Sequence, residues 1–340
     1  MIIESIGVIW GEKYIENFFK YSIGHFLSQQ NISYIKEKKL QLNVIFKESE
    51  KNIVEKFINK NHISFINQIF VPDYKFKKNK YESHSYLVSE FIKKVSSEKY
   101  IHLMYPDQII SNNFFEVLFK NNDNFDLYFM PGIRTVIKNE NINFLEKINI
   151  TGIDTKSLTN FIYNNLHIKM KLMTLNNEYY NNAPAWLIYN DPKGLVLKSF
   201  HLTPILIKNN LIKNNIDKEF IGIDDFISSI YLTDKIKFFN NSKEICWCSY
   251  ETERIEDFNI FKNTKDFETT NDWIDKCVTD YQKFLYKKYI FYLTYNDENL
   301  ESLKKIKTPF IIFKLMYFFK KPLKVFNKIK KKIINLYKKN

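Results

Sequence analysis

Two residues suited to ligand binding stand where the first apolar run of the sequence ends. Residues 2–9 are largely apolar, and Trp10-Gly11 follows them. A glycine at a strand end lets the backbone approach a ligand, and a tryptophan ring can stack on a base or a sugar. A simple turn into the next helix explains Gly11 equally well. The sequence contains neither G-x-G-x-x-G nor G-x-x-x-x-G-K-[ST], which argues against a dinucleotide-binding Rossmann domain and a P-loop.

A carboxylate follows a later apolar run. Tyr105-Pro106-Asp107 ends the run at residues 100–105. A carboxylate that a rigid proline holds just past a buried strand is well placed to bind a sugar hydroxyl or a metal-bound diphosphate. Capping of the following helix is the alternative for Asp107. We favour the functional interpretation because His102 and Tyr105 bracket the same strand end.

The candidates for acid–base chemistry lie further along the chain. His201 is part of an otherwise apolar stretch, and about twenty residues later a turn carries the paired carboxylates Asp224 and Asp225. A histidine and two carboxylates can form an acid–base set or bind a metal ion. The alternatives are a histidine buried in the core and an aspartate that caps a short helix. The choice among the three residues as a general base stays open.

Arg134 is a candidate for stabilising negative charge. Among 51 basic residues only Arg134 and Arg254 are arginine, in a composition rich in Lys, Asn, Ile and Phe. An AT-rich genome explains those four abundant residue types, so a retained arginine carries more weight than a single lysine. Arg134 follows Pro131-Gly132 and can bind a leaving diphosphate. A surface ion pair is the alternative.

Strands and helices in alternation must position these residues. Short apolar runs predict strands, and apolar residues at spacings of three and four predict helices. The predicted strands cover residues 2–9, 42–46, 63–71, 100–105, 125–130, 185–189, 194–200, 204–207, 236–239 and 245–250. The predicted helices cover residues 14–27, 82–95, 114–119, 141–173 and 273–285. This alternation is typical of an α/β fold with a mainly parallel sheet. The close spacing of the strands at 185–189, 194–200 and 204–207 suggests an antiparallel insert or a sheet edge.

Taken in order, these motifs resemble the glycosyltransferase-like proteins of bacterial surface-polysaccharide clusters. The motifs are Ile9-Trp10-Gly11, Pro106-Asp107, Phe200-His201-Leu202-Thr203-Pro204 and Ile223-Asp224-Asp225. The resemblance spans roughly residues 5–250 and implies a GT-A-type α/β fold, with a nucleotide-binding sheet and flanking helices. It also implies a nucleotide-sugar donor, for which the candidate binding residues are Trp10, Gly11, Tyr105, Asp107 and Arg134. We expect one glycosyltransferase domain over residues 1–303, with a donor half at about 1–140 and an acceptor half at about 141–303.

The resemblance leaves the metal open. GT-A enzymes commonly hold Mn²⁺ or Mg²⁺ on the donor diphosphate through a D-x-D motif, and this sequence contains no D-x-D. Either Asp107 alone binds the Mn²⁺ or Mg²⁺, or the enzyme works without a metal. In both cases the charge on the leaving nucleoside diphosphate needs a cation or hydrogen-bond donors. Asp224, Asp225 and His201 are the candidates for deprotonating the acceptor hydroxyl.

The net charge of +13 lies in the C-terminal tail. Residues 304–340 contain thirteen lysines and no acidic residue, while residues 1–303 hold 38 basic and 38 acidic groups. Beyond residue 322, apolar residues recur at helical spacing among lysines, which is typical of a basic amphipathic helix in a membrane interface. We therefore expect residues 310–340 to bind an anionic membrane surface, with packing on the protein's own body as the alternative. A nucleic-acid-binding arm would not need so much Phe, Ile and Leu, so no nucleic acid partner is expected.

The remaining features favour a cytoplasmic enzyme. Three cysteines give no disulfide framework, and we expect reduced, buried thiols. We find neither a signal-peptide pattern nor an apolar stretch of membrane-spanning length. The sequence thus predicts a glycosyltransferase, peripheral on the inner membrane, that moves a sugar from a nucleotide-sugar to a bacterial surface glycan or lipid-linked acceptor. The alternatives are a non-catalytic, membrane-docked scaffold of a polysaccharide assembly complex and a nucleic-acid-binding protein that uses the tail.

Overall fold

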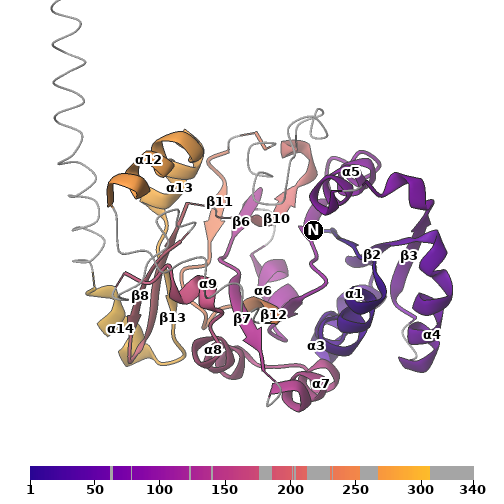
Figure 1. The fold of residues 1–340 in the computed structure, drawn as a ribbon, viewed down its shortest axis with the longest axis horizontal. Helices are drawn as coiled ribbons and strands as arrows, with labels where there is room; N and C mark the ends of the chain where they lie inside the picture. Colours follow the sequence, from indigo (N-terminus) through magenta and orange to yellow (C-terminus); the bar gives the residue numbers. More distant parts are fainter. Residues whose placement is uncertain are drawn as a thin grey trace, which may run out of the picture.

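The structure is a computed structural model in which helices flank a central sheet (Figure 1). It describes residues 1–61, 64–77, 79–121, 124–138, 141–175, 186–200, 202, 204–212, 230–231, 233–252 and 267–306.

Seven strands form the central sheet. In spatial order they are β3 (Ile66–Val71), β2 (Leu40–Lys47), β1 (Ile3–Val8), β4 (Tyr100–Leu103), β10 (Pro204–Lys208), β6 (Leu127–Phe129) and β11 (Ile236–Phe238). β10 runs antiparallel to both of its neighbours, and the other neighbouring pairs are parallel. The protein therefore has the mixed α/β fold with a mostly parallel sheet that the sequence predicts.

The middle of this sheet is covered on both faces. All six residues of β1 are buried, and β1 pairs in register with β2, from Ile3 opposite Leu40 to Val8 opposite Ile45. Strands buried on both faces need nearly continuous apolar runs, which explains why β1 and β2 are easily recognised in the sequence. Adjacent residues of β2 point to opposite faces. One of these faces is the one that carries Phe46, and Phe19 covers it there: the two rings are stacked, with centroids 6.5 Å apart.

Helices connect the strands β1, β2, β3 and β4 in turn. Figure 1 shows α5 on one side of strands β1 to β3, and α1 and α3 on the other. The α-helices are α1 (Glu12–Asn17), α2 (Ile23–Phe26), α3 (Gln29–Lys36), α4 (Lys51–Asn61), α5 (Lys80–Ile92), α6 (Phe114–Lys120), α7 (Ile142–Thr151), α8 (Thr155–Asn164), α9 (Ile168–Lys171), α12 (Phe267–Cys277), α13 (Asp280–Lys288) and α14 (Asp297–Lys304). Short 3₁₀ turns are η2 (Glu48–Glu50), η3 (Asp73–Lys75) and η5 (Asn209–Leu211), and η1 (Phe18–Ser22) is a π-helical turn.

Two smaller sheets accompany the central one. β12 (Trp247–Thr252) lies between β5 (Gln108–Ile110), to which it is antiparallel, and β7 (Ile133–Ile137), to which it is parallel. β9 (Gly194–Ser199) lies between β8 (Trp186–Asp191) and β13 (Phe291–Leu293), and both pairs are antiparallel. The latter sheet contributes to a second apolar core, which consists of Leu187, Val196, Phe200, Ile274, Val278 and Leu303.

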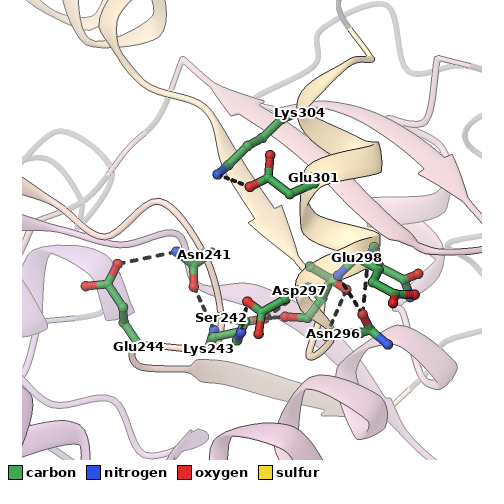
Figure 2. A network of polar contacts seen from close by, with 11 residues as sticks. Asn241, Ser242, Lys243, Glu244, Asn296, Asp297, Glu298, Glu301 and Lys304 are labelled. Carbon is green, nitrogen blue, oxygen red and sulfur yellow. Dashed lines mark hydrogen bonds and ion pairs between the residues drawn. The ribbon is translucent and has the colours of Figure 1, made fainter.

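Hydrogen bonds and an ion pair connect the C-terminal unit of β13 and α14 to the loop before β12 (Figure 2). The Ser242 hydroxyl donates to the Thr294 carbonyl over 2.9 Å and accepts from the Thr294 N–H over 3.0 Å. Lys243 forms an ion pair with Asp297, and the Asn296 side chain caps the first turn of α14. These contacts fix α14, which is the last described element before the tail.

The structure corrects three predictions, two about secondary-structure elements and one about the cysteines. The predicted helix at 273–285 is two helices, because Thr279 begins α13 with a capping box to Gln282. The strand at 204–207 forms neither an antiparallel insert with its sequence neighbours nor a sheet edge; as β10 it lies inside the central sheet, between β4 and β6. All three cysteines are free, but Cys277 is exposed, whereas Cys246 and Cys248 are buried as expected.

Over the ranges that the structure describes, no helix is long and apolar enough to cross a membrane. The tail at 310–340 lies outside the described residues. The domain boundary at 303 and the division of the domain near residue 140 stay predictions.

Candidate functional site

The carboxyl ends of β1 and β4 meet where the strand order of the central sheet changes direction. From β1 the chain passes to β2 and β3 on one side, and it then returns to place β4 on the other side of β1. In open α/β sheets, ligands bind outside the carboxyl ends of the strands at such a switch point. Trp10-Gly11 follows β1, and Tyr105 and Asp107 follow β4. Four predicted donor-binding residues thus stand where folds of this class bind ligands.

Glu50 of η2, the turn that follows β2, forms a hydrogen bond with the turn at Trp10-Gly11. Gly11 has a φ of 87°, in the left-handed region that favours glycine, and its N–H donates to Glu50 Oε1 over 2.6 Å. Its carbonyl accepts the first hydrogen bonds of α1, so the residue also makes the turn into the helix. The Trp10 ring meets the Phe76 ring at an angle of 60°, with centroids 5.3 Å apart.

Sequence reasoning missed Glu50. Its Oε2 is shielded from solvent and has no hydrogen-bond partner among the described residues. Beside it, Ser49 donates to the carboxylate of Asp73 from its hydroxyl (2.5 Å) and its N–H (3.2 Å), and the hydroxyl bond is the main cause that lowers the pKa of Asp73. These bonds join the ends of β1, β2 and β3. The available signal was Glu48-Ser49-Glu50, which directly follows the strand that ends at Lys47.

Asp107 lies in the connection between β4 and β5. Its side chain is partly exposed, yet the protein around the carboxyl raises its pKa to about 6. The nearby guanidinium of Arg134 opposes this increase, and the carboxylate of Glu251 adds to it. The alternative role as a helix cap is wrong, because β5 follows Asp107 and the N-cap of α6 is Asn113.

Tyr105, two residues before this carboxylate in the chain, forms an aromatic pair with Trp247. The rings of Tyr105 and Trp247 are stacked, with centroids 6.1 Å apart and an interplanar angle of 7°. The Trp247 ring also covers Gly132, where an added Cβ would lie 2.0 Å from Trp247 Cη2. Gly132, which follows β6 and Pro131, therefore leaves room for the Trp247 ring, and a residue with a Cβ would not.

Arg134 stands on β7, opposite Ser249 of β12. Its Nη1 is 3.6 Å from Oε2 of Glu251, and the same oxygen is 3.7 Å from Nε2 of the buried His167. The side chains of Arg134 and Glu251 are each nearly half exposed, but Oε2 of Glu251 is itself shielded from solvent and has no hydrogen-bond partner among the described residues. The surface ion pair considered for Arg134 exists, but it lies at the site and next to Asp107. Sequence reasoning missed Trp247 and Glu251, whose signal was their period-two spacing with Ser249 along one strand.

The predicted catalytic residues cannot be placed relative to this site. His201, Asp224 and Asp225 all lie outside the described residues. Their assignment stays a prediction.

A groove of about 330 Å³ lies away from this site, between α5 and the central sheet. Its polar base is Glu4, which pairs with Lys99 Nζ at 2.6 Å and accepts from Asn43 at 2.8 Å. Both carboxylate oxygens of Glu4 are thus satisfied within the protein. The groove runs along the face of the sheet, and among the described residues none that line it has a buried side-chain polar atom without a hydrogen-bond partner.

The fold and these residues define an α/β protein with a candidate ligand site at the switch point of a mostly parallel sheet. No protein-family model matches the sequence, and no curated protein matches it as a relative.

Solved structures that resemble the fold include two glycosyltransferases and an isomerase. The galactosyltransferase LgtC, in complex with donor and acceptor sugar analogs, is 10% identical; the match covers 83% of this chain and 99% of LgtC, with a TM-score of 0.35. The bifunctional glycosyltransferase WbbM is 11% identical over 85% of this chain and 52% of WbbM, with a TM-score of 0.36. Mannose-6-phosphate isomerase from Helicobacter pylori is 16% identical over 41% of this chain and 52% of the isomerase, with a TM-score of 0.27.

The chain thus spans about half the length of the isomerase and of WbbM. Because these TM-scores lie below 0.5, the neighbours do not assign a function to this chain.

Proposed function

We propose that this protein is a glycosyltransferase that moves a sugar from a nucleotide-sugar donor to a bacterial surface glycan or lipid-linked acceptor at the inner face of the membrane. The observation that supports the proposal is the position of Trp10-Gly11 and Tyr105-Pro106-Asp107 at the switch point, with Arg134 near Asp107. An aromatic ring, an open backbone turn, a carboxylate and a guanidinium suit the base, diphosphate and hydroxyl groups of such a donor.

The proposed reaction needs a base and a stabilised leaving group. The bond between the anomeric carbon and the diphosphate oxygen breaks, and the electron pair leaves with the nucleoside diphosphate. The acceptor oxygen forms the new bond to that carbon, and its proton passes to Asp224, Asp225 or His201. The half-exposed guanidinium of Arg134 binds the diphosphate as negative charge develops on it. Asp107, when ionised, accepts a hydrogen bond from a sugar hydroxyl.

For the metal, we propose the metal-independent alternative. Within the described ranges, no three His, Cys, Asp or Glu side chains gather as metal ligands. Asp107 has a guanidinium among its charged neighbours, and this cation would repel a divalent metal ion. The described residues therefore do not fit a site for Mn²⁺ or Mg²⁺, and Arg134 supplies the positive charge instead.

A donor screen tests this proposal. UDP-, GDP- and CMP-sugars are added to the full-length protein with either EDTA or MnCl₂, and the melting temperature is measured. We expect one donor class at saturating concentration to raise Tm by about 5 °C. The increase should persist in EDTA and should be largely lost in Arg134→Met, because the diphosphate then lacks its cation.

The matched control is Lys120→Met, which removes a cation from an exposed pair with Glu116 on α6. It should bind the donor as the parent does. A protein whose Tm responds to none of the donors would contradict the proposed activity and favour the non-catalytic scaffold.

We propose further that residues 310–340 bind the anionic inner surface of the membrane. Ten of the thirteen lysines between residues 304 and 340 lie in this segment and support the proposal, because each lysine near such a surface contributes about 1 kcal/mol. A deletion of 310–340 retains α14 and Ile306, which packs against the second core. We expect it to stop pelleting with phosphatidylserine vesicles while its donor binding is unchanged. Unchanged pelleting would contradict this assignment, and binding of the parent tail to RNA but not to vesicles would favour the nucleic-acid alternative.

A further inference from the structure

The segment between α1 and α2 contains a π-helical turn, η1, that ends at Ser22. The Ile23 N–H donates to the Phe18 carbonyl, five residues earlier, in place of the usual i to i−4 bond. A π turn inserts one extra residue into a helix at a cost in hydrogen-bond geometry, and it occurs often at functional sites. Here the turn brings the fully buried Ser22 against the connection that carries Asp107.

The hydroxyl of Ser22 joins three distant parts of the chain. It donates to the Pro106 carbonyl over 2.7 Å, and its oxygen is 3.1 Å from the hydroxyl of Tyr250 on β12. Because the single proton of Ser22 goes to Pro106, a hydrogen bond between the two hydroxyls takes its proton from Tyr250, whose hydroxyl also donates toward the Asn17 carbonyl. Burial raises the pKa of Tyr250, so its hydroxyl keeps the proton that this bond needs.

Tyr250 contacts the same connection a second time. Its backbone N–H donates to the Asp107 carbonyl over 3.0 Å, and its hydroxyl lies 3.2 Å from the Asn17 carbonyl and 3.5 Å from that of Pro106. The ring of Tyr21, from η1, meets the Tyr250 ring at 89°, with centroids 5.9 Å apart. The carbonyls of both Pro106 and Asp107 are thus held by residues from other elements.

We propose that Ser22 and Tyr250 are positioning residues, which hold the Pro106-Asp107 connection so that the Asp107 carboxylate faces the donor. This connection has only four residues between β4 and β5, and it lies outside both strands. Without the two hydroxyls, the peptide of Pro106 would lose its partner and Asp107 could shift by a fraction of an ångström. The inference rests on the proposed function, because Asp107 must contact the donor for its position to matter.

The test compares three single-hydroxyl variants of the full-length protein. Ser22→Ala and Tyr250→Phe remove the proposed positioning contacts. Tyr128→Phe is the matched control, because Tyr128 is equally buried and lies away from the site. Its hydroxyl also donates to a backbone carbonyl, that of Asn121, at a distance of 2.7 Å. For each variant we measure urea unfolding, the Kd of the nucleotide-sugar found in the donor screen, and the Kd of the corresponding nucleoside.

We expect similar losses of stability in all three variants. Only Ser22→Ala and Tyr250→Phe should weaken binding of the nucleotide-sugar, by about 10- to 100-fold. Binding of the nucleoside, which lacks the diphosphate and sugar, should not change in any variant. In an Asp107→Asn background, Ser22→Ala should cause no further loss of donor affinity, since it acts through Asp107.

Two outcomes separate this inference from the proposed function. If Asp107→Asn weakens donor binding but Ser22→Ala and Tyr250→Phe bind the donor as well as Tyr128→Phe does, the two hydroxyls only stabilise the fold and the positioning proposal is wrong. If Asp107→Asn itself leaves donor binding intact, the assignment of Asp107 to the donor is wrong, and the positioning proposal fails with it.

Discussion

Replacing Asp107 by asparagine should give a protein that is more stable than the parent at pH 7.5 and that no longer transfers sugar. Burial raises the pKa of the Asp107 carboxyl to about 6, from an ordinary value of 3.8. Around neutral pH the folded protein therefore holds an ionised carboxylate in surroundings that favour its protonated form. Asparagine has nearly the same shape and no charge, so it removes the free-energy cost of burying an ionised carboxylate. The same change removes the charged acceptor that the proposed donor site needs.

The sign of the pH dependence follows from the direction of the shift. Between pH 4 and pH 6 the folded state keeps a proton that the unfolded state releases, so the contribution of Asp107 to stability falls as the pH rises. A shift of this size corresponds to about 3 kcal/mol at most, and partial exposure of the side chain reduces the expected effect to about 1–2 kcal/mol. The advantage of Asp107→Asn should thus be full at pH 7.5 and smaller at pH 5.

Urea unfolding at the two pH values and turnover of the donor measure these effects. Turnover should fall by about 100-fold or more, as expected when one stabilising group is removed from a reacting site. The control is Asp154→Asn: Asp154 caps α8 through Ser157, which lowers the pKa of its carboxyl, so this variant should gain no stability and should retain turnover. Loss of stability in Asp107→Asn, or full turnover, would show that Asp107 is a structural residue.

The strand ends that carry Trp10-Gly11 and Asp107 could be predicted because their signals are local. β1 and β4 are buried along their whole length, so in the sequence both are recognised as short, largely apolar runs. Each run stops at residues that suit a turn, a glycine in one case and a Pro-Asp pair in the other. That the two ends meet at a switch point follows from the strand order of a parallel sheet, which the alternation of elements predicts in outline.

The residues that complete the site could not be predicted in this way. Trp247 and Glu251 reach it because β12 pairs with β5 and β7, which lie more than a hundred residues earlier in the chain. The period-two spacing of Trp247, Ser249 and Glu251 indicates a strand but not its partners, and a slip of one residue in the register would turn both side chains to the other face. The role of Ser22 is hidden for a similar reason, since only the π turn and the folded position of Pro106 reveal it.

The central position of β10 was also beyond sequence reasoning. Its close spacing with β8 and β9 predicted an antiparallel insert or a sheet edge, and β8 and β9 do form a hairpin. Four of the five residues of β10 are buried, so the strand needs cover on both faces. It obtains that cover between β4 and β6, where burial outweighs the preference of neighbouring strands to pair.

Acidification to pH 5 should destabilise this protein by about 6 kcal/mol through three buried histidines. Burial lowers the pKa of His25 to about 3, of His84 to about 4 and of His102 to about 3. The ordinary value is 6.5, so between pH 6.5 and pH 4 the unfolded chain takes up protons that the folded protein refuses. Stability is therefore complete above pH 6.5 and is lost as the pH falls, with about 2 kcal/mol for each histidine at pH 5.

The surroundings of these residues explain why the folded protein resists protonation. The His102 ring is packed against Phe26, Phe114 and Phe115, and its one hydrogen bond is to the Ser5 hydroxyl, 2.8 Å from Nδ1. No carboxylate among the described residues pairs with Nε2 of this ring, which is buried without a hydrogen-bond partner. A charged imidazolium there would lose its hydration and gain little in return.

Urea unfolding between pH 7.5 and pH 5 measures this loss, and His84→Gln identifies its source. Near pH 5 the three histidines take up nearly three protons on unfolding and Asp107 releases nearly one, so the parent should unfold with a net uptake of about two protons. His84→Gln should take up one fewer, because glutamine does not titrate. Protonation of Asp107 in the folded state offsets about 1 kcal/mol of the loss, so the net decrease should be about 5 kcal/mol. This is a large part of the 5–15 kcal/mol typical of folded domains, and the protein should be close to unfolding at pH 5. A stability that stays level down to pH 5 would mean that the three rings are hydrated or paired in the folded protein.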